Sequence, residues 1–215
     1  MRETLVRQRQ SLVGATIEFV VLAGGRRTCI GIDLQSGAFV RASEPLRNSP
    51  IRPFTVVRGI TSSTTLDRPE QPEYVRFSES LVVTDRLDRR KMDKLVRPLV
   101  HPKHRPLLGF HGPSAPWWEH ETSGSVALVE PERGPVVELA ERGLRCRFLW
   151  SGLHYDLPLE DTRILAKLDW LPTGPVPHNE ISTIMGFRPD RLVVALGRPD
   201  RGYCPKVIAG FIPRT

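Results

Sequence analysis

The sequence lacks long apolar runs, paired cysteines and an apolar N-terminal segment. No apolar run approaches the roughly 18 residues of a transmembrane helix, and residues 1–15 are charged and polar, unlike a secretory signal. The 3 cysteines are odd in number and widely spaced, which is typical neither of a disulfide framework nor of a cysteine zinc site. We therefore expect a cytoplasmic protein that makes no membrane contact.

Motifs of known catalytic chemistry are also missing. The sequence contains no GxxxxGKS/T phosphate loop, no GxSxG nucleophile elbow and no HExxH metal motif. One proline-rich stretch holds histidines without metal-ligand spacing, namely His101, His104, His111 and His120. An enzymatic alternative pairs His154 with Asp156 as base and orienter, and uses loop 24–27 to hold a nucleotide phosphate. No nucleophile accompanies this pair, so we expect a non-catalytic protein without cofactor or metal.

The charge balance is basic and dominated by arginine. The net charge is +7, from 31 basic and 24 acidic residues, and 26 of the basic residues are arginines. Arginine suits phosphate and base contacts because its guanidinium forms bidentate hydrogen bonds and stacks. A GC-rich coding bias would produce the same excess, so both interpretations stay open. The most charged run, residues 85–94, has a net charge of only +2 and is typical of a solvated helix face.

Turn-forming residues and short alternating segments predict an all-β fold with short helices. The 17 glycines and 20 prolines are about 17% of the chain, against a typical ~12%. Residues 144–150 alternate well, with Leu144, Cys146, Phe148 and Trp150 on one strand face and the arginines between them on the other. Further strands are expected at 16–22, 29–34, 38–43, 55–60, 125–129, 136–139, 153–157, 192–196 and 206–212. Short helices are expected in 89–100, 162–171 and 180–185.

A strand, a Ser-Gly turn and a second strand occur at residues 29–43 and again at 144–157. This echo predicts two copies of one small β-barrel. The proline-rich stretch 98–123 between them is expected to connect an N-terminal domain, 1–110, with a C-terminal domain, 111–215.

Three segments carry a family resemblance. They are residues 19–43, residues 144–157 with Tyr155-Asp156-Leu157, and residues 202–209, which read GYCPKVIA against a family pattern GYCYKLVA. In these segments the chain resembles the dual OB-containing domain family of prokaryotes. It departs from the family pattern at Gly24-Gly25-Arg26-Arg27, which replaces NSRK, at Phe39, which replaces a tryptophan, and at Pro205. The resemblance implies two OB-like barrels in a nucleic-acid-binding or sensing module that is met beside prokaryotic defence genes.

We therefore predict a module that binds single-stranded DNA or RNA. The expected phosphate contacts are Arg26, Arg27 and Arg41 on the first barrel, and Arg145, Arg147 and Lys206 on the second. Tyr155 and Tyr203 are the expected stacking residues. The alternative is a protein-interaction subunit of a defence or nucleic-acid-processing complex, with Trp117 and Trp118 in the interface.

Overall fold

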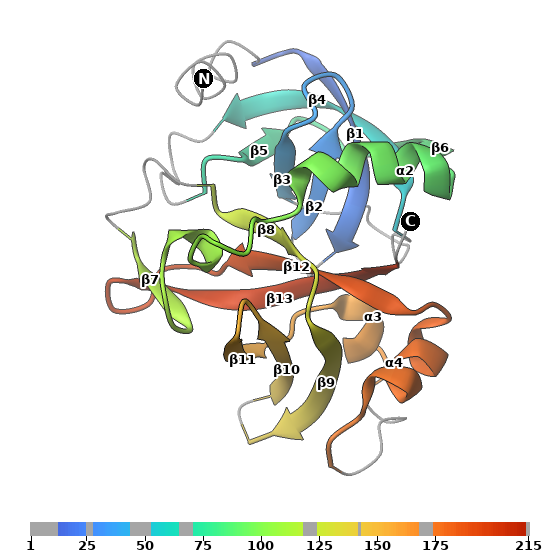
Figure 1. The fold of residues 1–215 in the computed structure, drawn as a ribbon. Helices are drawn as coiled ribbons and strands as arrows, with labels where there is room; N and C mark the ends of the chain where they lie inside the picture. Colours follow the sequence, from blue (N-terminus) through green and yellow to red (C-terminus); the bar gives the residue numbers. More distant parts are fainter. Residues whose placement is uncertain are drawn as a thin grey trace.

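The computed structural model describes residues 13–24, 28–43, 53–64, 71–117, 124–141, 143–167 and 174–213. It is mostly β-structure with short helices, as expected (Figure 1). The strands are β1 (Thr16–Gly24), β2 (Thr28–Asp33), β3 (Phe39–Ser43), β4 (Thr55–Thr64), β5 (Tyr74–Phe77), β6 (Val82–Arg86), β7 (Ser114–Pro116), β8 (Val126–Val129), β9 (Arg133–Ala140), β10 (Gly143–Trp150), β11 (Leu153–Pro158), β12 (Pro189–Leu196) and β13 (Tyr203–Pro213). The helices are α2 (Arg89–Val96), α3 (Thr162–Leu165) and α4 (His178–Met185), with 3-10 turns η2 (Arg97–Leu99) and η3 (Leu107–Gly109).

The first barrel is a closed sheet of five strands. Its order is β1-β2-β3-β5-β4, and β1 also pairs with β4, which closes the barrel. Neighbouring strands of this sheet are antiparallel, with one exception. Strands β3 and β5 run parallel, and there Arg41 and Ala42 pair with Tyr74 and Val75. This arrangement is that of the OB fold, a five-stranded Greek-key barrel. Strand β6 extends the sheet beyond β4.

The second half repeats the same strand order in an open form. Strands β9, β10 and β11 form one antiparallel sheet, and β12 pairs with β13 in another. Leu159, directly after β11, forms a parallel bridge with Ile208 of β13, so β11 and β13 match β3 and β5 of the first barrel. The β2–β3 and β10–β11 hairpins are therefore the two copies in the sequence echo. Strands β7 and β8 flank β13 and β12.

Three apolar clusters form the core. The interior of the first barrel contains Phe19, Val21, Cys29, Val40, Ala42, Val57, Val75 and Leu81. The interior of the second half contains Cys146, Phe148, Trp150, Leu157, Leu192 and Phe211, among others. The third cluster, here named the seam, joins Val20, Leu22, Ile30, Ile32 and Val56 of the first barrel to Met92 and Val96 of α2 and to Val126, Leu128, Val193, Ala195, Val207 and Ile212 of β8, β12 and β13.

The seam covers the outer side of β1 and β2 in the first barrel. On β1 and β2, Phe19, Val21 and Cys29 point into the barrel, whereas Val20 and Ile30 point into the seam. In Figure 1 the β12–β13 hairpin accordingly lies between the first barrel and the β9–β10–β11 sheet. Leu107 and Leu108, from the predicted connector, pack into the core of the second half. The predicted domain boundary at 110/111 itself stays a prediction.

Candidate nucleic-acid interface

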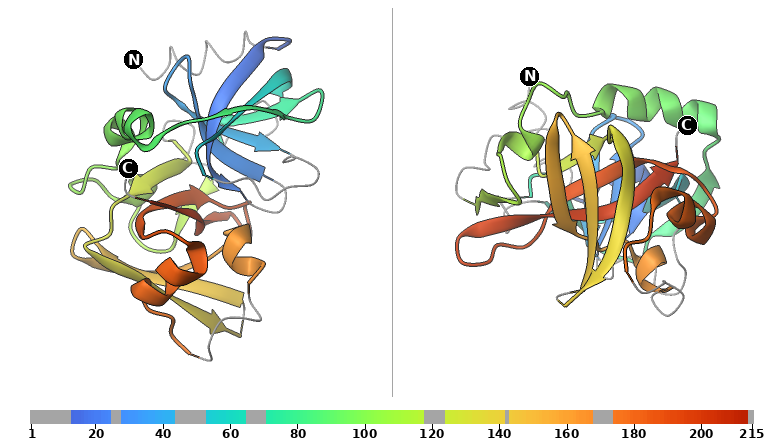
Figure 2. Two further views of the ribbon diagram at one scale, coloured as in Figure 1. Left: turned by 90° about the vertical axis from the view of Figure 1, so that its right-hand side faces the viewer. Right: turned by 60° about the horizontal axis from the view of Figure 1, so that its bottom comes forward.

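Strand β10 turns two arginines outward from the second barrel. Leu144, Cys146 and Phe148 are buried, and the intervening Arg145 and Arg147 lie on the opposite face, as the alternation predicted. In the ladder Arg147 lies between Val136 of β9 and Asp156 of β11. This sheet lies at the front of the right-hand view in Figure 2. The face of the second and third strands is where OB folds hold oligonucleotides.

Both arginines are already paired with acids. Arg145 Nε lies 2.7 Å from Asp156 Oδ1, and Arg147 Nη2 pairs with Glu138 Oε2. Such exposed pairs are worth only about 0–1 kcal/mol, so a phosphate can replace the carboxylate at low cost. Arg133, which lies opposite Leu149 in the same sheet, is a further exposed cation. Sequence reasoning passed over Arg133 because it precedes the predicted strand.

The equivalent face of the first barrel is covered, and this changes the role of Arg41. Arg41 is only 5% exposed. Its guanidinium donates to the carbonyl of Leu196 at 2.8 Å and to that of Ser125 at 3.3 Å. The predicted phosphate contact is therefore replaced by a contact that joins β3 to the strands across the seam. Burial under β8 and β12, which are distant in sequence, is the physical reason.

Lys206 is also buried rather than presented to solvent. Its Nζ donates to the carbonyls of Phe110 and Gly112 at 2.5 and 2.8 Å. Burial lowers the pKa of Lys206 to about 8, because the charged form loses its hydration. The side chain ties the loop after η3 to β13, and in this position it cannot reach a phosphate in solvent.

Tyr155 lies inside the second barrel. Its ring stacks on Phe148, with the ring centroids 5.3 Å apart, and only 5% of the residue is exposed. Burial raises the pKa of its hydroxyl. The predicted role in stacking on a base is therefore replaced by packing in the core, because β11 directs this residue inward.

Tyr203 and Trp117 come together at one end of β7 and β13. Tyr203 lies opposite Pro116 in the ladder, and the Trp117 amide donates to the Gly202 carbonyl at 3.2 Å. Tyr203 is 50% and Trp117 43% exposed. The sequence assigned these two residues to different functions, and pairing of β7 with β13 makes them neighbours. Trp118 lies outside the described residues.

The turn between β12 and β13 adds two arginines that sequence reasoning missed. Arg198 and Arg201 are exposed in a turn closed by backbone hydrogen bonds between Asp200 and Tyr203. In Figure 1 this turn projects beside β7. It corresponds to the loop between strands four and five, which contacts ligands in OB folds. The usable signal in the sequence was the pair of arginines between Gly197 and Gly202.

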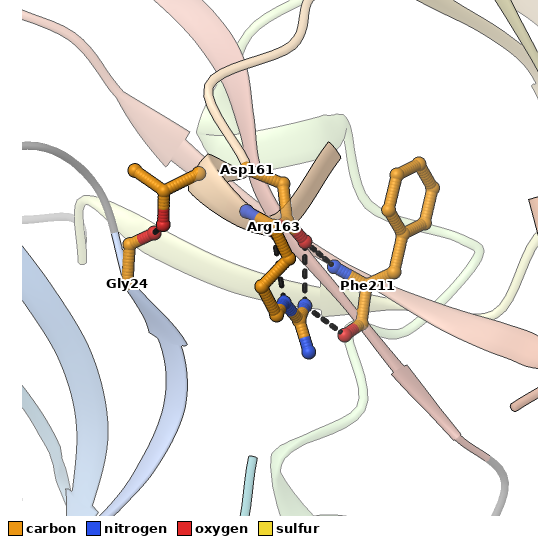
Figure 3. Close-up of polar contacts among 5 residues, drawn as sticks. Gly24, Asp161, Arg163 and Phe211 are labelled. Atoms are coloured by element: carbon orange, nitrogen blue, oxygen red, sulfur yellow. Dashed lines mark hydrogen bonds and ion pairs between the residues drawn. The ribbon is translucent and has the colours of Figure 1, made fainter. Parts of the chain in front are cut away.

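Arg26 and Arg27 lie outside the described residues, whereas Gly24, the first residue of their loop, ends β1. Thr162 donates its hydroxyl to the Gly24 carbonyl at 2.7 Å. Beside it, the buried Asp161 carboxylate accepts from Arg163 Nε and from the Phe211 amide, both at 2.9 Å (Figure 3). The two charges neutralise each other at the junction of β1, α3 and β13. This cluster positions the backbone.

Of the enzymatic alternative, His154 and Asp156 lie within the described residues, whereas most of loop 24–27 does not. His154 and Asp156 are both exposed, and Asp156 holds the guanidinium of Arg145. The described residues contain no group of 3 or more His, Cys, Asp or Glu placed to hold a metal ion. Burial raises the pKa of the Cys29 thiol to about 12 and that of Cys146 further. Neither thiol is therefore a ready nucleophile.

Comparison with protein-family models, curated proteins and solved structures finds no match for this chain. The resemblance to the dual OB-containing family therefore stays a prediction. Among the described segments, no helix has the length and apolar character needed to cross a membrane.

Proposed function

We propose that this protein binds single-stranded nucleic acid, without catalysis, on the exposed face of the β9–β10–β11 sheet. One observation carries the proposal. The two halves share one strand order. The seam covers the β2–β3 face of the first barrel, whereas the equivalent face of the second half is open and bears Arg133, Arg145 and Arg147. The first barrel then acts as the scaffold and the second as the binding unit.

The end of β7 and β13 supports a preference for single strands. Tyr203 and Trp117 offer exposed rings, and Arg198 and Arg201 add positive charge beside them. Proteins that bind single strands combine a basic surface with aromatic rings on which bases stack. Unpaired bases present the faces that such stacking requires, whereas a duplex hides them. The same chemistry accepts DNA and RNA.

The test compares two variants that each lower the net charge by 2. The double variant Arg145→Gln/Arg147→Gln removes the outward cations of β10, and Arg58→Gln/Arg188→Gln removes two exposed cations that are ion-paired elsewhere. Binding of labelled oligo(dT) and oligo(rU) is measured by fluorescence anisotropy across a salt series. Each lost phosphate contact reduces the steepness of log K against log salt by about 0.7. We expect a reduction of about 1.4 for the β10 variant and no change for the control.

An equal change in the steepness of log K against log salt for both variants would contradict the proposed face. Absence of wild-type binding at low salt would contradict the proposed function. In that last case the exposed Trp117 and Tyr203 favour the second candidate, a protein-interaction subunit of a nucleic-acid-processing or defence complex, because exposed aromatics are typical interface anchors. Loss of a co-purified partner on Trp117→Ala, with the fold intact, would then support that candidate.

A further inference from the structure

Helix α2 presents a strongly cationic face to solvent. It buries Met92 and Val96 in the seam, and in Figure 1 it crosses in front of β1. The right-hand view of Figure 2 places it along the upper edge of the molecule. Its exposed cations, with the residue that follows it, are Arg89, Arg90, Lys91, Lys94 and Arg97.

The acids of this run are engaged by the protein itself. Asp88 caps the helix and accepts from the Lys91 amide at 2.8 Å. Asp93 Oδ1 lies 3.6 Å from Arg191 Nη2 of β12, and Asp85 accepts from the Arg86 amide at 2.7 Å. Within the described ranges no ion pair joins the five α2 cations to an acid. Of these acids only Asp93 lies within α2, and it is directed to Arg191, so the helix itself carries an excess of exposed cations.

The positive charges of α2 lower the stability of the helix itself. After the N-cap Asp88, the first turn holds Arg89, Arg90 and Lys91 and no further acidic residue, although the helix dipole favours acids there by about 0.3–1 kcal/mol each. Arg90 and Lys94 repel each other at i, i+4 spacing, which costs about 0.2–0.5 kcal/mol. Local rules of stability are broken in this way mainly at functional sites.

We propose that the exposed face of α2 is a second nucleic-acid contact surface, which holds a phosphodiester backbone by charge alone. The ligand class depends on the proposed function, but the site is separate from the β9–β10–β11 face. Charge complementarity selects the occupant, because lysine and arginine side chains are the usual partners of backbone phosphates. The helix contains no aromatic residue, so contact here is independent of base sequence.

The test adds Arg90→Gln/Lys94→Gln to the two variants described above. All three variants lower the net charge by 2, and glutamine keeps the helix propensity of lysine and arginine. We expect the α2 variant to reduce the steepness of log K against log salt for oligo(dT) by about 1.4. Its urea midpoint should equal or exceed that of wild type, because one repulsive pair is removed.

The outcomes separate the two sites. If the α2 variant binds like wild type while the β10 variant loses affinity, the α2 surface is overturned and the proposed function stands. If only the α2 variant loses affinity, the α2 surface is supported and the sheet face is overturned. An equal loss in the Arg58→Gln/Arg188→Gln control overturns the α2 surface as a specific site. Wild-type binding to phosphatidylserine vesicles but not to oligonucleotides overturns it as well.

Discussion

Lys206 is a buried cation whose charge the fold tolerates poorly. It is fully buried, and its pKa falls from 10.5 to about 8 in the folded protein. Two backbone carbonyls accept hydrogen bonds from its Nζ. The amine stabilises the fold through these bonds, although burial of its positive charge is unfavourable. Both contacts hold the loop that leads into β7.

Wild-type stability is expected to rise with pH relative to Lys206→Met. Between pH 8 and 10.5 the folded protein has lost the Lys206 proton while the unfolded chain keeps it. The unfolded state then binds more protons, so the free energy of unfolding increases with pH. The difference between wild type and Lys206→Met should grow by on the order of 3 kcal/mol across this window. Urea titrations at several pH values measure it.

The cysteines make the comparison with the variant necessary. The pKa of Cys29 is raised to about 12, so its contribution to stability falls as pH rises above 9, opposite to that of Lys206. This effect is the same in both proteins and cancels in the difference. A difference that stays constant with pH would contradict the buried-amine interpretation. Lys167→Met, at an exposed lysine, serves as the control.

Short apolar and β-branched segments between turn residues predicted most strands, and three strands were missed. Strand β10 was predicted because its two faces differ sharply in polarity. Strand β6 was missed because its two valines are adjacent and polar residues follow them, so no alternating apolar face marks it. Strand β7 has 3 residues and ends in proline, and β5 has 4 residues. Such strands form because a neighbouring strand pairs with them. The sequence of the short segment does not show that partner.

The pairing of β1 with β2 depends on a close approach at Gly31. A Cβ atom at Gly31 would lie 2.4 Å from the Val20 carbonyl oxygen and 2.5 Å from Phe19 Cδ2. Since the carbonyl is backbone, side-chain rotation cannot relieve the clash. We expect Gly31→Ala to lower the free energy of unfolding by about 1–3 kcal/mol.

Gly24→Ala is the matched control for that prediction. Gly24 also lies in a strand of the first barrel, and a Cβ atom there would meet nothing within 4 Å. We expect it to be neutral or slightly stabilising, because alanine restricts the unfolded chain. Equal urea midpoints for both variants would refute the close approach between β1 and β2.

In the molecule as a whole, the seam packs the two halves against each other, and we expect them to unfold together. Its apolar residues come from both halves and from α2. Polar groups at its edge are satisfied across the halves, since Ser125 donates its amide and its hydroxyl to the Glu73 carboxylate, both at 2.6 Å. All 4 tryptophans follow residue 110, so their fluorescence reports on the second half. We expect its unfolding transition to coincide with that of far-UV circular dichroism.

Arg41→Met tests the seam directly. It removes the donors to the Leu196 and Ser125 carbonyls, and we expect a loss of about 2–4 kcal/mol in the free energy of unfolding. Oligonucleotide affinity of the folded variant should be unchanged, because the side chain is buried. Arg58→Met, at an exposed and ion-paired arginine, should change stability by less than about 0.5 kcal/mol. If Arg41→Met weakened oligonucleotide binding without lowering the free energy of unfolding, Arg41 would instead belong to the nucleic-acid interface.

Of the predicted site, the residues on an open strand face could be derived from the sequence. Arg145 and Arg147 were placed outward because β10 alternates with a period of two. Arg41 occupies a similar outward position, yet the strands across the seam cover it. Lys206 lies on the side of β13 that carries Cys204 and Ile208 of the second-half core. Alternation tells which side of a sheet a residue faces, but not whether that side meets water.

The sequence alone predicts the class of the fold, the hairpins that recur in both halves and the outward side of β10. These depend on contacts between near neighbours, which local patterns record. Packing of the two halves determines which barrel face is open and which cations reach solvent. Arg41 is separated by 84 residues from Ser125 and by 155 from Leu196, and contacts over such distances arise when the two sheets pack. The basic charge of the composition thus becomes a surface only where packing leaves it exposed.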